Sequence, residues 1–156
     1  MYKNIIVQSA ESFTARVTAL AVECGFSAPR IVRAYDPELA LEQLASSSAP
    51  FIIITMESAG IDDSEDEIKS GLYKKMKFNV DVFLHVTDRT NAVLDAVVNQ
   101  SESLVNSLAE MDNWTEPDGT RFWISDKEMG DIVSPAQLND NIAYCRMTFD
   151  ISGFSE

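Results

Sequence analysis

The stretch KMKFNVDVFLHV, Lys75–Val86, alternates between apolar and polar positions without a break. One face carries Met76, Phe78, Val80, Val82, Leu84 and Val86, and the other carries Lys75, Lys77, Asn79, Asp81, Phe83 and His85. A period of two residues is typical of a strand with one buried and one solvated face. At about 3.3 Å per residue this strand would be about 40 Å long, whereas most strands have about 5–6 residues. A strand of that length can reach a neighbouring subunit, so we expect the chain to work in an assembly.

Length and charge limit the classes of function. The 156 residues, with a net charge of −13, predict a single domain over residues 1–156. The acidic balance argues against wrapping nucleic acid, which needs clustered Lys and Arg. It suits a conduit through which DNA slides without binding, and it also suits solubility alone. We find no signal peptide and no apolar run near the ~20 residues of a membrane span, so we expect synthesis in the cytoplasm and no membrane partner.

The remaining patterns predict two long helices, one short helix and four further strands. We expect a helix over Glu11–Cys24 that extends back towards residue 2, a strand over Arg30–Tyr35, a helix from Asp36 to Ala45, a central strand over Phe51–Met56, a helix from Asn91 to about Asp112, and strands over Arg121–Ser125 and Ile142–Ile151. A short strand over Asn4–Gln8 is the alternative to the extended first helix. Residues 126–141 read as irregular. The order predicts an α+β fold, an α/β sandwich, with a mostly antiparallel sheet of about five strands and helices packed on one face.

An acidic segment precedes the long strand. Its acidic residues are Glu57, Asp62, Asp63, Glu65, Asp66 and Glu67, and the first basic residue after them is Lys69. Such a density of charge indicates an exposed loop at about residues 57–70. The segment lacks the alternating ligands and central glycine of a calcium loop, so we expect no metal there.

The catalytic inventory is poor. The chain has one histidine, His85, and no nucleophile or phosphate-binding motif accompanies it. Cys24 and Cys145 stand far apart among apolar residues and are expected to be small buried side chains. We therefore expect no enzyme activity, no catalytic residue, no metal and no cofactor.

Aromatic residues at polar positions indicate an interface. Phe83 interrupts the polar face of the long strand, Tyr144 does the same in the final strand, and Phe154 follows in a short tail. Cover by a helix or loop of the same chain is the alternative. The candidate subunit or tube interface comprises Lys75, Lys77, Asp81, Phe83, His85, Tyr144 and Phe154. Trp114 and Trp123 are expected in the core.

The first half of the chain resembles a response-regulator receiver domain, with PELALEQL placed before a strand FIIIT. The resemblance fails at the functional positions. Gln8 and Ser9 stand where a receiver has its acidic pair, and Thr55, Met56 and Glu57 stand where it has its phosphoacceptor aspartate. A degenerate receiver-like signalling module without that aspartate is the alternative function.

A second resemblance covers most of the chain and is carried by residues 50–111. Pro50 and FIIIT open a strand, an acidic excursion follows, and KFNVDVFLHV then leads into a long helix, with a final strand near the C-terminus. This order resembles the lambda-type tail terminator proteins of long-tailed phages. The helical character of Asp36–Ser48 and the length of Asp126–Asn141 depart from that pattern.

The resemblance implies a structural virion protein without catalysis. Such a protein forms a ring, usually a hexamer, caps the tail tube, stops its polymerisation and presents a surface to the head-side connector, while DNA passes through the lumen without specific binding. We further expect the long strand and the final strand to offer open edges that a partner extends. The acidic loop is expected to meet the tube or to line the lumen.

Overall fold

The computed structural model describes residues 4–44, 50–61, 73–86, 88–110, 113–132 and 141–154. Its elements, in chain order, are α1 (Ile5–Glu23), β1 (Arg30–Arg33), α2 (Pro37–Leu44), β2 (Phe51–Ile61), β3 (Tyr73–His85), α3 (Asn91–Glu110), β4 (Asn113–Thr115), β5 (Arg121–Ile132) and β6 (Ile142–Phe154). The expected α+β class is confirmed.

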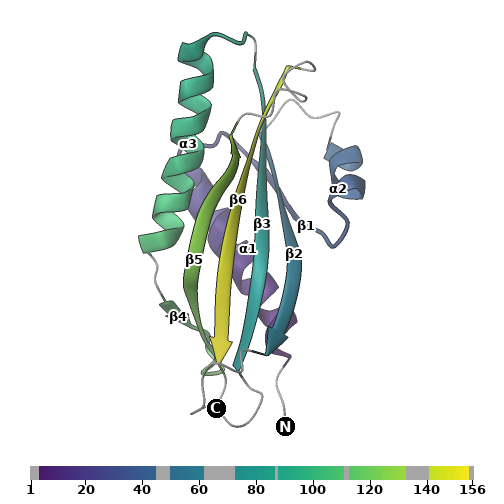
Figure 1. The fold of residues 1–156 in the computed structure, drawn as a ribbon, viewed down its shortest axis with the longest axis vertical. Coiled ribbons are helices and arrows are strands. Elements are labelled where there is room, and N and C mark those ends of the chain that lie inside the picture. The colour runs from purple at the N-terminus through teal and green to yellow at the C-terminus, as the bar shows by residue number, and fades with distance from the viewer. Residues whose placement is uncertain are drawn as a thin grey trace.

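A mixed sheet runs the length of the molecule (Figure 1). Its six strands lie in the order β1-β2-β3-β6-β5-β4. Among the strands of the described residues, only β1 and β2 pair in parallel, through the short crossover helix α2, and the other four pairings are antiparallel. The expected sheet of about five mostly antiparallel strands was therefore close, with β4 as the additional strand. Helices α1 and α3 pack on one face, and α2 lies beside β2.

The main core lies between α1, α3 and the sheet. The ring of Phe13 on α1 lies 5.1 Å from that of Phe78 on β3 and 5.4 Å from that of Phe149 on β6. These three side chains are fully buried, and each such burial stabilises the fold by about 1.5–3 kcal/mol. The apolar positions of the long strand thus bind α1 to the centre of the sheet.

The positions of α1 and α2 are explained by features of the sequence. The stripe through Ile5, Phe13, Val17 and Ala21 faces the sheet, which confirms the long first helix, and the short strand over Asn4–Gln8 was wrong. The α2 helix begins after Asp36, whose Oδ1 accepts hydrogen bonds from the backbone N–H groups of Glu38 and Leu39 at 3.0 and 3.3 Å.

Three strands extend beyond their expected ends. β2 continues from Met56 to Ile61 across a bulge, because β3 pairs with it as far as Lys74 opposite Ile61. β5 continues to Ile132 and β6 to Phe154, because they pair with each other. Residues 126–132 are therefore strand and not irregular. Hydrogen bonds to the neighbouring strands keep the polar and glycine residues of these segments in extended conformation, although such residues have a low intrinsic preference for strands.

The expectation of open edges on the long and final strands was wrong. β3 pairs with β2 on one side and with β6 on the other, and β6 pairs with β3 and β5. Both strands lie inside the sheet, so a partner could extend the sheet only at the other strands.

Gly153 tests the close packing of β6 against α1. A Cβ atom at this position would lie 2.7 Å from Phe122 and 2.8 Å from Ile5, so we expect Gly153→Ala to lower the free energy of unfolding by about 1–3 kcal/mol through overpacking. Gly60→Ala, also in a strand, meets nothing within 4 Å and serves as the control in urea unfolding. Equal midpoints for the two variants would contradict the packing described here.

Candidate functional site

The polar positions of the long strand lie on the sheet face directed away from α1 and α3, which we term the outer face. The register aligns its side chains in rows across β2, β3 and β6. From one end these rows are Phe51–Phe83–Tyr144, Ile53–Asp81–Arg146, Thr55–Asn79–Thr148 and Ser58–Lys77–Asp150. The outer face therefore changes along its length from aromatic to paired polar to charged.

The aromatic row is a stack of three rings. Phe83 lies 4.8 Å from Phe51 and 4.8 Å from Tyr144, with interplanar angles of 15° and 25°. Phe83 is only 6% exposed. Its placement on a solvated face was therefore wrong, because the same chain covers it with a second apolar cluster that includes Ile53 and Val32. His85 lies at the rim of this cluster, is exposed, and has its ring 6.4 Å from that of Phe51.

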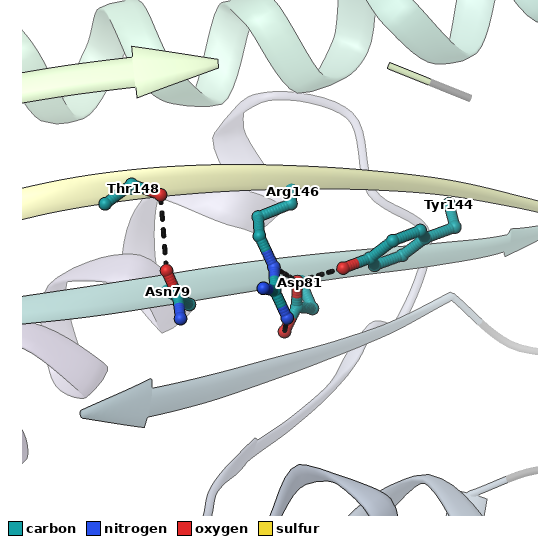
Figure 2. A network of polar contacts seen from close by, with 5 residues as sticks. All are labelled: Asn79, Asp81, Tyr144, Arg146 and Thr148. Carbon is teal, nitrogen blue, oxygen red and sulfur yellow. Dashed lines mark hydrogen bonds and ion pairs between the residues drawn. The ribbon is translucent and has the colours of Figure 1, made fainter. Parts of the chain in front are cut away.

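Asp81 is the centre of a network of polar contacts (Figure 2). Its Oδ1 accepts hydrogen bonds from Arg146 Nε and from Tyr144 OH, each at 2.7 Å, and its Oδ2 accepts from Arg146 Nη2 at 3.2 Å. The Asp81 side chain is 3% exposed and that of Arg146 is 38% exposed. Asp81 was expected in solvent, and this too was wrong. A buried carboxylate needs donors, and the adjacent strand supplies them.

Tyr144 and Arg146 both stay protonated at neutral pH, because the network raises the pKa of each. Burial, and then the hydrogen bond to Asp81, raises the pKa of Tyr144 well above its usual range. The hydrogen bond to Asp81 likewise raises the pKa of the Arg146 guanidinium, which stays charged. At neutral pH the arrangement is a fixed charge pair with a neutral phenol, which suits a structural role better than proton transfer.

The other end of the outer face is open and charged. Thr148 Oγ1 donates to Asn79 Oδ1 at 3.2 Å, and beyond this pair Lys77 is half-buried and Lys75 is exposed. A small cavity of about 30 Å³ is lined by Lys77, Asp126, Lys127, Glu128, Thr148 and Asp150. Among the expected interface residues, Lys75, Lys77 and His85 are thus accessible, and Tyr144 is half-buried.

Two further expectations were wrong in their structural setting. Phe154 is half-buried and ends β6, where it pairs with Tyr73 and Arg121, so it does not lie in a tail. Glu57 is exposed but sits at the bulge of β2, within a strand. The other acidic residues of the expected loop, Asp62, Asp63, Glu65, Asp66 and Glu67, lie outside the described residues.

A contact between α1 and the β4–β5 hairpin was not foreseen. Trp114 Nε1 donates to Ser12 Oγ at 2.7 Å, Ser12 Oγ bonds to Glu116 Oε1, and the guanidinium of Arg16 lies 4.8 Å from the centre of the Trp114 ring. No local pattern joins residues about 100 positions apart. Trp114 is buried as expected, whereas Trp123 is only partly so.

The remaining chemistry of the described residues is sparse. No group of three or more His, Cys, Asp or Glu among them is placed to hold a metal ion. Cys24 and Cys145 are free thiols, and no helix in this part of the chain is long and apolar enough to cross a membrane. A groove of about 720 Å³ follows α1 and is lined by Gln8, Glu11, Ser12, Ala15, Arg16, Ala19, Leu20, Glu23 and Glu116.

Comparison with protein families finds no matching family model, and comparison with curated proteins finds no significant match.

Removing the partner of Asp81 tests the energetic role of the network. Arg146→Met leaves a buried carboxylate with one donor fewer at each oxygen, so we expect a loss of about 1.5–3 kcal/mol in the free energy of unfolding. Arg121→Met, at an exposed arginine on the neighbouring strand, is the control and should stay within about 0.5 kcal/mol. If both variants unfold at the same urea concentration, the pair contributes nothing.

The phenol of Tyr144 predicts an alkaline loss of stability. Because folding raises its pKa, the unfolded chain releases this proton first, at about pH 10. The contribution is complete below that pH and is lost as the pH rises towards the folded pKa. Urea unfolding from pH 8 to 11 should therefore show a steeper decline for the wild type than for Tyr144→Phe. Parallel declines would contradict the assignment.

Proposed function

We propose that this chain is a ring-forming structural protein of a phage tail, a tail terminator that caps the tail tube, stops its polymerisation and joins the tail to the head-side connector. In this proposal it assembles in the host cytoplasm as a homo-oligomer, by analogy a hexamer, and becomes part of the virion. DNA passes through the lumen without specific binding. No catalysis, metal or cofactor is involved.

The order of elements carries the proposal. In the tail terminator pattern a central strand, an excursion, a long strand and a long helix follow one another, and the described elements β2, β3 and α3 follow in that order, with β6 at the end. The long strand β3 occupies the middle of the sheet, between β2 and β6. This supports the assignment of residues 50–111 to the part of the pattern that is most characteristic.

The chemistry of the outer face supports a scaffold. The polar groups at its centre are committed to one another, since Asp81 is bound by Arg146 and Tyr144, and Asn79 by Thr148. A net charge of −13 gives a surface from which DNA phosphates are repelled. Both properties suit a rigid ring around a conduit.

The receiver-like module finds support only in the β1–α2–β2 crossover, which is parallel. A receiver domain has a parallel central sheet, whereas β2–β3, β3–β6, β6–β5 and β5–β4 are antiparallel. The topology therefore favours the tail protein over the signalling module.

Electron microscopy of polymerising tail tubes tests the function. With the purified chain present, we expect tubes that stop growing and carry a ring at one end. Deletion of Asp62–Glu67 should leave the fold intact, as judged by circular dichroism and thermal unfolding, but impair stacking on tubes, since the acidic segment is proposed to meet the tube. Replacing its five acidic residues by Asn and Gln at unchanged length is the matched control, and it separates charge from length.

Unchanged capping by both altered chains would refute the role of the acidic segment. A wild-type chain that forms no rings and caps no tubes would refute the proposed function, and a stable monomer or dimer would favour the receiver-like module.

A further inference from the structure

Each edge of the sheet is covered at one end only. β1 pairs with β2 over Phe51–Ile54, so Thr55–Ile61 has no partner strand on that side among the described residues. At the opposite edge β4 pairs with β5 over Arg121–Trp123. Ile124–Ile132 of β5 therefore has no partner strand on its outer side among the described residues. Each edge thus consists of a short projecting strand and a longer recess.

The two projections lie at opposite ends of the sheet. The register connects Ile54 through Val80 and Met147 to Met129, so β1 is level with the recess beside β5. It also connects Ile61 through Lys74 and Gly153 to Phe122, so β4 is level with the recess beside β2. The profile of one edge is therefore the complement of the other.

Strand direction allows these edges to meet. The four long strands β2, β3, β6 and β5 alternate in direction, so rotation of a second copy about an axis along the strands brings its β5 antiparallel to β1. In the same placement the second copy's β4 lies end to end with β1. The two short strands then share one strand position in the combined sheet, between β2 of the first copy and β5 of the second. Neighbouring strands lie about 4.8 Å apart, so each recess is one strand wide and is filled by one short strand of the other copy.

We propose that a second copy of this chain docks along the sheet edge in this way, with β1 of one copy in the recess beside β5 of the next. The inference rests on the proposed function, since it assigns the contact between subunits of the ring. The contact is heterologous, so its repetition generates a ring when the rotation between successive copies closes.

Charge complementarity favours the same partner. β1 carries exposed Arg30 and Arg33, whereas the recess beside β5 carries exposed Asp126 and Glu128 with Lys127 between them. Bulges after Ile124 and Met129 also interrupt the regular pairing of β5 with β6. Charges and bulges protect an edge against unselective pairing. In the placement described above, Arg33 of one copy is level with Met129 of the other, one residue from Glu128, so these two opposite charges come close together.

Cross-linking tests the contact. In a Cys24→Ser background, Arg33→Cys and Glu128→Cys lie on opposite edges of one chain, roughly 19 Å apart across four strand spacings, so a bis-maleimide shorter than this links them only between copies. We expect the double variant to give a ladder of bands up to the ring. Each single variant should give dimers at most, and Arg33→Cys with Glu102→Cys on exposed α3 is the matched control and should give no ladder.

Charge exchange provides an independent measurement. Arg33→Glu and Glu128→Arg should each lower the ring fraction in native mass spectra several-fold, and their combination should restore it. Rings without a ladder in the double-cysteine variant would overturn the edge contact and leave the proposed function standing. A chain that stays monomeric at every concentration, with no ladder, would also overturn the contact, and tube capping in micrographs would then decide the proposed function separately.

Discussion

The pairing of β3 with β6 is the constraint on which the rest of the structure depends. It is continuous from Tyr73 opposite Phe154 to His85 opposite Ile142, and it joins the middle of the chain to its end. Because side chains alternate along both strands, this one register places Phe78 beside Phe149 under α1 and at the same time places Asp81 beside Arg146 on the outer face. Core and outer face are thus two consequences of a single alignment.

The charge pair gives that alignment its specificity. A slip of one residue would send the apolar set of β6 to the outer face and leave the buried Asp81 without its donors. Hydrophobic burial cannot by itself exclude slips of two residues, since apolar positions recur with that period. The Asp81–Arg146 pair excludes them, because an unpaired buried charge costs far more than a paired one contributes. We therefore regard the pair as a determinant of register more than of stability.

The dependence of the fold on pairing between distant strands also explains which elements the sequence could predict. Alternation located β3 and β6, and helical stripes located α1 and α3, since these signals are local. Alternation identifies two faces but not what covers each. Lys75 and His85 were therefore placed correctly in solvent, whereas Lys77 is half-buried, and Asp81 and Phe83 are buried. The full lengths of β2 and β5, and the contact of Ser12 with Trp114, depend on partners far away in the chain, and no local pattern encodes them.

In the proposed ring, contact between two such acidic chains depends on the charges that lie close together at the interface. At physiological ionic strength charges separated by more than about 8 Å are largely screened, so most of the net charge of −13 acts weakly between neighbouring copies. What remains is the chemistry of the two edges in the proposed contact, where Arg33 of one copy is level with Met129 of the other, one residue from Glu128. In the proposed conduit, the same screening would confine the repulsion of DNA to phosphates that come close to the protein surface. An acidic subunit is therefore compatible with a closed ring, provided that its few basic residues lie at the edge that meets the next copy.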